Sequence, residues 1–269
     1  MICIFLCVTC TIKAQQPDWL ATATDLYGKE QYFEASVFCE RVLYESNEAQ
    51  PVQQAIWLKV QCYKQQREFA KAAAFMAQAQ TRVRMDSMQR ALYGEMGTCY
   101  YLAGDFENAI AVADRAAVLF AGSNNWLTLL KLLSLNELNR WQEAAVLYKQ
   151  QSALPGDSLP DYYAMLPRQK SEKKAGWLAT FIPGAGHFYA GKPWEGVASV
   201  ALQAGGLYYG ITSWIHKYYI SAWLVGGGLV GTFHMGGISR AQTLVQQYNK
   251  RKAADFNNKV REALLARWN

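Results

Sequence analysis

The sequence predicts an all-α chain: an N-terminal helical solenoid, then a transmembrane helical hairpin, then an amphipathic C-terminal helix. Three observations predict this order. A pattern recurs every 35 to 37 residues in the first half, residues 175–239 hold only three charged side chains, and residues 240–269 place seven basic residues around an apolar stripe. These patterns are typical of stacked helix pairs, of membrane helices and of an amphipathic helix, respectively.

Residues 1–14 have the character of a secretory signal peptide. A mostly apolar run from Ile2 to Ile12 is followed by Ala14, a small residue of the kind that precedes a cleavage site, although a basic start is missing. We expect cleavage after Ala14 and export of the rest of the chain. An uncleaved anchor and a lipid-modified Cys10 are the alternatives.

Three cysteines would remain after cleavage: Cys39, Cys62 and Cys99. Their spacing fits no zinc or redox motif. We expect them to be small apolar core residues, with one disulfide between two of them as the alternative in an exported domain. The sequence does not indicate which pair would be joined.

The repeat in residues 17–155 consists of an aromatic residue, two variable positions and an alanine. The copies begin at Tyr32, Phe69, Phe106 and Trp141, and their alanines lie 37, 37 and 35 residues apart. This period is typical of a helical solenoid. Each copy is expected to place one amphipathic helix before the aromatic residue and one after it, with alanines that let the two helices pack closely.

This pattern resembles the tetratricopeptide repeat (TPR) family over residues 17–155, with Pro155 closing the fourth copy. The resemblance implies a right-handed stack of helix pairs whose concave groove binds a peptide or a protein. A purely architectural stack is the alternative.

Residues 156–174 are expected to form a linker and a basic collar. Three prolines lie between residues 155 and 167, and proline disfavours helix both at its own position and at the preceding one. The RQKSEKK segment that follows carries a net charge of +3. We expect it at the level of lipid headgroups; a solvated basic loop is the alternative.

Residues 175–239 are expected to form a glycine-rich membrane domain. Lys192, Glu195 and Lys217 leave uncharged runs of 17, 21 and 22 residues in this stretch. A helix needs roughly 20 mainly apolar residues to cross a bilayer. The second and third runs have that length.

The predicted transmembrane helices are Gly196–Ile215 and Tyr218–Ser239. Residues 175–191 are interrupted by Pro183 and glycines, so they are expected to form either a re-entrant segment or a third span. Two and three crossings therefore both remain open, and with them the side of the membrane on which the C-terminus lies.

Two G-x-x-x-G pairs fall in the predicted spans: Gly206 with Gly210, and Gly227 with Gly231. Small residues let helix backbones approach closely in lipid. We expect these pairs at the seam between the two helices, or between copies of the chain in a homo-oligomer.

The string PGAGHFYAGKPWEG resembles the signature that opens the TM-two domain, a module of two transmembrane helices with a short connection. The signature residues are Pro183, Gly184, Gly186, Phe188, Tyr189, Gly191 and Gly196. Pro183 and the turn after the first span depart from the family pattern. The resemblance implies a helical hairpin and little chemistry. Similar tails, often ending in a pair such as Tyr248-Asn249, occur fused to TPR repeats in bacterial envelope proteins of unknown role.

Residues 240–269 are expected to form a basic amphipathic helix. Its apolar stripe includes Leu244, Tyr248, Phe256 and Val260. Such a helix lies on a membrane surface or packs back on the solenoid, and both alternatives remain open.

No catalytic, cofactor or metal site is predicted. The only histidines are His187, His216 and His234, and no phosphate loop, dinucleotide fingerprint or paired metal motif is present. We therefore expect a non-catalytic, membrane-anchored TPR adaptor or scaffold at the bacterial inner membrane, with its TPR domain in the periplasm. Its expected partners are a protein and membrane lipid, not nucleic acid. An oligomeric pore or transporter subunit with a TPR cap is the alternative.

Overall fold

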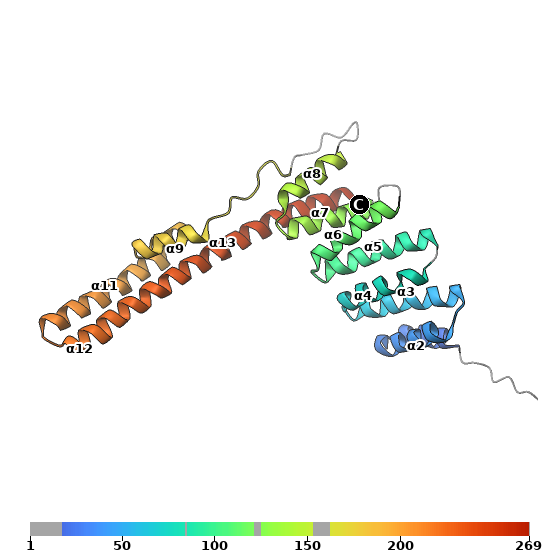
Figure 1. Cartoon of the computed structure of the whole chain (residues 1–269), viewed down its shortest axis with the longest axis horizontal. Coiled ribbons are helices and arrows are strands. Elements are labelled where there is room, and N and C mark those ends of the chain that lie inside the picture. The colour runs from blue at the N-terminus through green and yellow to red at the C-terminus, as the bar shows by residue number, and fades with distance from the viewer. Residues whose placement is uncertain (1–17, 84, 121–124, 153–161, 269) are drawn as a thin grey trace, which may run out of the picture. The chain divides into compact units, whose positions relative to one another are not determined.

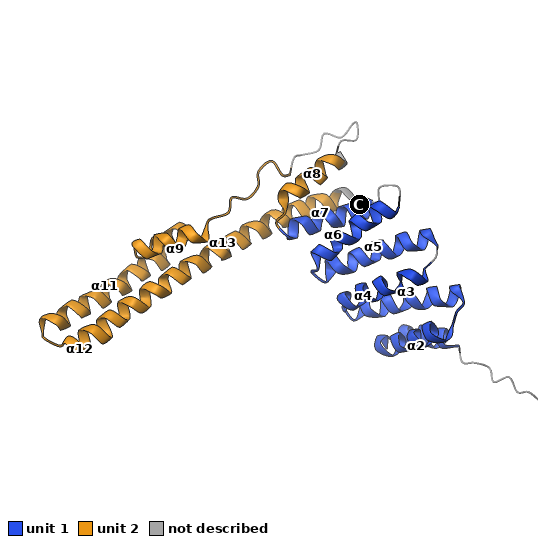
Figure 2. Cartoon of the chain, in the orientation of Figure 1, with its two compact units in different colours: residues 1–138 blue, residues 139–269 orange. Residues whose placement is uncertain are grey.

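The computed structural model describes residues 18–83, 85–120, 125–152 and 162–268, and every regular element of these ranges is a helix. The all-α prediction is therefore confirmed. The chain divides into two compact units between Leu138 and Asn139 (Figure 2). The predicted signal peptide and the first six residues of the predicted linker lie outside the described residues.

Unit 1 is a solenoid-like stack in which each helix packs on the next one along the chain (Figure 1). Its helices are α1 (Trp19–Gly28), α2 (Tyr32–Glu45), α3 (Ala49–Gln65), α4 (Phe69–Ala79), the short η1 (Gln80–Arg82), α5 (Asp86–Leu102), α6 (Phe106–Leu119) and α7 (Asn125–Glu137).

The sequence repeat corresponds to a repeated turn. The aromatic residues predicted to open the second helix of each pair are the first residues of α2, α4, α6 and, in unit 2, α8. Two positions before each of them the backbone is left-handed, with φ between +57° and +77°, at Glu30, Arg67, Gly104 and Asn139. In the first three copies, the residue after the left-handed one donates its backbone N–H to the carbonyl oxygen five residues earlier, as at a Schellman helix end. These bonds join Gln31 to Leu26, Glu68 to Tyr63, and Asp105 to Tyr100.

The core of unit 1 contains the small residues that the repeat predicts. The repeat alanines Ala35, Ala72 and Ala109 are fully buried, beside larger residues such as Met76 and Leu92. The three cysteines are buried and free. Burial raises the pKa of the Cys39 thiol to about 12 and those of Cys62 and Cys99 to about 11. They are therefore core residues, as expected, with no disulfide among them.

Unit 2 contains a long helical hairpin and the helices packed against it (Figure 1). Its helices are α8 (Trp141–Ser152), α9 (Glu172–Phe181), α10 (Ala185–Ala190), α11 (Pro193–Ile215), α12 (Tyr219–Ser221), the π-helical η2 (Ala222–Gly227) and α13 (Gly228–Trp268). α13 has 41 residues without a break. The second half of the second predicted span and the predicted C-terminal helix are thus parts of one helix, whereas the start of that span lies in α12 and η2.

Within the described ranges, no helix combines the length and the apolar character that crossing a bilayer requires. The predicted spans Gly196–Ile215 and Tyr218–Ser239 are therefore not supported as transmembrane helices. The prediction relied on the absence of charge, but the glycines, tyrosines and tryptophans of these segments add little to hydropathy. Residues 175–191, expected to form a re-entrant segment or a third span, contain most of the ten-residue α9 and all of the six-residue α10, so they do not form one span.

The end of α13 packs on α8. The indole Nε1 of Trp141 donates a hydrogen bond of 2.9 Å to Asn257 Oδ1, and both residues are buried. Phe256 meets the rings of Trp141 and Tyr163 edge-on, at centroid distances of 5.5 and 6.0 Å. The C-terminal segment therefore contacts the helix that the sequence assigned to the fourth repeat.

Candidate functional site: a glycine-rich helical hairpin

Between residues 193 and 239, the two arms of the hairpin have their large apolar side chains on the outside. The buried residues of α11 are small or polar: Gly196, Gln203, Gly206 and Ser213. The exposed large residues of α11 include Val197, Leu202, Leu207, Tyr208, Ile211, Trp214 and Ile215. Those from the turn and the other arm include Tyr218, Ile220, Trp223, Leu224, Leu229 and Met235. In unit 1, by contrast, large apolar side chains such as Met76 and Leu92 are buried.

One glycine contact sets the distance between the two arms. A Cβ atom added to Gly226 would lie 2.5 Å from the Cα of Gly210, closer than real side chains allow. Gly206 faces Val230, whose Cγ2 would lie 3.2 Å from an added Cβ. The predicted pair on α11, Gly206 and Gly210, is therefore at the seam, and its partner is Gly226.

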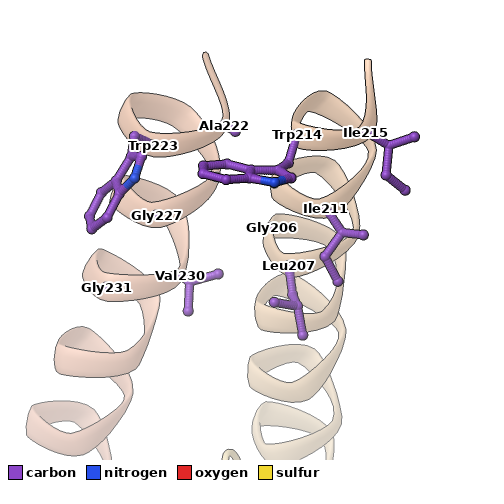
Figure 3. Close-up of a pocket in the computed structure, with 12 residues that line it drawn as sticks. Gly206, Leu207, Ile211, Trp214, Ile215, Ala222, Trp223, Gly227, Val230 and Gly231 are labelled. Atoms are coloured by element: carbon purple, nitrogen blue, oxygen red, sulfur yellow. The ribbon is translucent and has the colours of Figure 1, made fainter. Parts of the chain in front are cut away.

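The second predicted pair lies outside this seam, in an open apolar groove between the two arms (Figure 3). Nothing lies within 4 Å of a Cβ added to Gly231, and Gly227 meets only the side chain of Trp223. The groove has a volume of about 590 Å³. The ring of Trp214 reaches across its upper end toward Ala222 (Figure 3). The residues that line the groove include no charged side chain.

The signature residues form a tight corner where α9, α10 and α11 meet. Gly184 has φ +80°, and an added Cβ would lie 2.6 Å from the carbonyl oxygen of Gly196. A Cβ on Gly196 would in turn meet the ring of Phe188 at 2.8 Å. Gly191 ends α10 with φ +85°, and Pro183 is exposed in the turn before α10. Left-handed backbone and contacts of this kind favour glycine.

The same corner packs on α13 through Gly186. An added Cβ there would lie 2.6 Å from the carbonyl oxygen of Ala175 and 2.7 Å from the Cβ of Ala241. The signature string thus contains glycines at which α9, α10, α11 and α13 pack closely.

Tyr189, Tyr248 and Asn249 enclose Lys170 in an arrangement that we call the Lys170 clasp. The Lys170 ammonium donates to the carbonyl oxygen of Tyr189 at 2.8 Å and lies 4.1 Å from the ring centroid of Tyr248. The Asn249 amide accepts from the backbone N–H of Lys170 and donates to its carbonyl, both at 2.8 Å. The Tyr-Asn pair noted in the sequence therefore joins the basic collar to α13.

A polar cluster lies at the base of the hairpin. Arg240 makes a bidentate ion pair with Glu195, at 2.8 and 3.2 Å, and this contact lowers the pKa of the Glu195 carboxyl. His187 is buried, and its Nδ1 has no hydrogen-bond partner among the described residues. Burial lowers the pKa of His187. The described residues contain no group of three or more His, Cys, Asp or Glu side chains placed to hold a metal ion.

The ion pair between Glu195 and Arg240 was not predicted, although the sequence holds a signal for it. Each of these residues borders one of the two long uncharged runs, and antiparallel arms bring those ends together. Comparison with known proteins adds no further residue roles: no protein-family model, curated protein or solved structure matches the chain.

Proposed function

We propose that the chain is a non-catalytic adaptor of the bacterial cell envelope. Its hairpin embeds in the lipid of the inner membrane, and its helical stack binds a protein partner on the periplasmic side. The observation that carries this proposal is the distribution of side chains in residues 193–239 of the hairpin, with small and polar residues inside and large apolar residues outside.

An exposed apolar surface of this extent is unfavourable in water, and it is stabilised by contact with lipid or with a protein partner. Moving a Val, Leu, Ile or Phe side chain from water to an apolar medium contributes about 1.5–3 kcal/mol. Large exposed apolar patches on soluble proteins mark interaction sites. The many such side chains on the hairpin therefore favour insertion into an apolar surrounding.

Lipid fits this surface better than a globular protein partner does. Both arms are uncharged between the Glu195–Arg240 pair and Lys217, over roughly 30 Å at 1.5 Å per residue, which is close to the thickness of a hydrocarbon core. Tryptophan and tyrosine gather at the turn, as in the aromatic belts of membrane proteins.

The modest hydropathy of each arm is compatible with insertion of the two arms as a packed pair. The residues that lower the hydropathy of α11 include Gln203 and Gly206, which are buried. Residues that face the other arm do not contact lipid. The side chains that would contact it, such as Leu207 and Ile211, are apolar.

For the stack, the proposal rests on the TPR resemblance and on a concavity between the first helices of successive pairs. A pocket of about 690 Å³ lies between α1 and α3. It is lined by Asp18, Leu20, Ala21, Thr24, Asp25, Gln54 and Leu58, a mixture of polar and apolar side chains that suits an extended peptide segment.

Vesicle flotation without detergent tests the hairpin. We expect the wild-type protein to float with phosphatidylcholine vesicles. Leu207→Asp should weaken this binding roughly 100-fold, because a carboxylate at the centre of a bilayer costs about 2.5–3.5 kcal/mol. Met165→Asp is the matched control, since Met165 is 88% exposed and lies outside the hairpin. Wild-type protein that stays unbound would overturn the membrane half of the proposal.

Affinity capture in mild detergent tests the stack. A stoichiometric protein partner should be lost from the double variant Ala21→Arg, Gln54→Arg, because two long cations would fill the pocket. It should be retained by Val118→Arg, whose side chain is exposed on α6. Equal capture by both variants would show that this pocket is not the binding surface.

The open groove favours a second candidate, self-association in lipid as a pore or transporter subunit. Cysteine cross-linking tests it, because a Cβ meets nothing within 4 Å at either Gly231 or Gly228, and only Gly231 lines the groove. Self-association through the groove predicts dimers of Gly231→Cys and few of Gly228→Cys. Equal yields would argue against this interface.

A further inference from the structure

We propose that α9 and the basic residues around it form a surface that binds the headgroups of anionic phospholipids at the base of the hairpin. This inference rests on the proposed function, because it assumes that the hairpin inserts into lipid. It specifies that the lipid is anionic, and it identifies the part of the chain that recognises the anionic headgroups.

The inner face of α9 is fixed to the hairpin. α9 lies alongside α13 (Figure 1). Its residues Ala175, Gly176 and Ala179 are buried, and the two alanines share an apolar cluster with Ala241 and Val245 of α13. A Cβ added to Gly176 would lie 2.6 Å from the Gln242 amide nitrogen. The helix therefore has a defined orientation, and its opposite face points away from α13.

That outer face carries an exposed aromatic pair. The rings of Trp177 and Phe181 are stacked, with centroids 5.4 Å apart and an interplanar angle of 15°. Their side chains are 64% and 71% exposed, and Ile182 beside them is 60% exposed. Exposed tryptophan side chains are suited to the headgroup–acyl boundary.

The position of α9 along the hairpin matches that boundary. Gly176 contacts α13 at Gln242, and the hairpin turn lies at Lys217. The helix from Tyr219 to Gln242 is roughly 35 Å long at 1.5 Å per residue, slightly more than one hydrocarbon thickness. With the hairpin inserted, α9 would lie at the surface from which the hairpin enters.

The surroundings of α9 are strongly basic. Seven basic side chains are exposed here, and none of them forms an ion pair with another described residue: Arg168, Lys173, Lys174, Lys192, Lys250, Arg251 and Lys252. The Lys170 clasp joins the segments that carry them. Of the acidic residues nearby, Glu195 is paired with Arg240, Glu172 accepts from Gln246, and Asp255 is exposed one turn after Lys252. This charge complements phosphate-bearing anionic headgroups.

Vesicle binding at low salt tests the proposal with two lipid compositions, phosphatidylcholine alone and phosphatidylcholine with phosphatidylglycerol. We expect tighter binding to the anionic vesicles. The triple variant Lys250→Gln, Arg251→Gln, Lys252→Gln should lose roughly fivefold in affinity for these vesicles per cation removed, with little change on neutral vesicles. Raising the salt concentration should reduce the preference.

The charge-matched control is Lys29→Gln, Lys71→Gln, Arg115→Gln, which removes three exposed cations from unit 1. It should bind like the wild type. A second variant, Trp177→Ala with Phe181→Ala, should bind more weakly to both kinds of vesicle. Equal wild-type binding to neutral and anionic vesicles, or equal losses in the two triple variants, would overturn this inference alone. Binding to neither composition would overturn the proposed function.

Discussion

At the residue scale, the effect of a glycine in the hairpin depends on what its missing side chain would touch. Gly226 faces backbone, because an added Cβ would lie 2.5 Å from the Cα of Gly210. Gly228, two positions later, has nothing within 4 Å. The two residues are neighbours in the same arm, so they form a matched pair for substitution.

We predict opposite effects of alanine at these positions. Gly226→Ala should destabilise the hairpin by about 1–3 kcal/mol, because the arms must move apart. Gly228→Ala should stabilise it by about 0.5–1 kcal/mol, because alanine loses less backbone entropy in a helix. Thermal unfolding followed by circular dichroism in one detergent measures both. Equal shifts would contradict the close contact between the arms.

His187 predicts a pH dependence at the base of the hairpin. Burial lowers its pKa in the folded protein; Glu195 opposes this shift and Arg240 adds to it. In the unfolded chain the pKa of His187 has its ordinary value of 6.5, so the unfolded chain takes up the proton at a higher pH than the folded protein does. The folded state is therefore most stable above pH 6.5, and it loses stability as the pH falls below that value.

We therefore expect the unfolding temperature to fall between pH 7.5 and pH 5.0, and the fall to be smaller in His187→Gln. His216→Gln serves as the control, because His216 is exposed at the hairpin turn. If the two variants show the same pH dependence, His187 is not the responsible group.

At the element scale, the Lys170 clasp shows how a short loop is held against a long helix. The side-chain amide of Asn249 forms hydrogen bonds with both the backbone N–H and the backbone carbonyl of Lys170, in place of another stretch of backbone. Buried or partly buried backbone groups need such partners. The contact joins positions 79 residues apart in the sequence.

Hydrogen exchange of the Lys170 amide tests this contact directly. Asn249→Ala removes the acceptor of that N–H, and the exchange rate should rise roughly 5- to 150-fold, which corresponds to a loss of about 1–3 kcal/mol. Gln247→Ala changes an exposed residue two positions away and should leave the rate unchanged. Unchanged exchange in Asn249→Ala would refute the role of the clasp.

At the scale of the whole molecule, the two units bury separate apolar clusters. Met76 belongs to the cluster in unit 1, and Val245 belongs to the one in unit 2; both are fully buried. Because each unit has its own core, we expect the chain to unfold in more than one step.

Core truncations should separate the steps. Met76→Ala should lower the midpoint of one denaturant transition by an amount equivalent to about 2–5 kcal/mol, and Val245→Ala should lower the other by a smaller amount. Circular dichroism of the full chain in detergent follows both transitions. A single transition that both substitutions shift equally would contradict separate cores.

Sequence alone determined the features that depend on neighbouring residues. The 35–37-residue spacing located the first residues of α2, α4, α6 and α8 and the buried alanines, because aromatic, turn and small residues act within a few positions of one another. It also located the glycine-rich hairpin, because charged residues border its uncharged runs.

Features that depend on distant residues became known only from the three-dimensional packing of the helices. The pairing of Gly210 with Gly226 instead of Gly227, the ion pair of Glu195 with Arg240, and the contact of Trp141 with Asn257 all depend on how helices rotate against each other. Rotating a helix by one residue, about 100°, changes which side chains face its neighbour. Hydropathy averaged along the chain cannot show that the large apolar residues of the hairpin point outward, because that direction is set by packing between its arms.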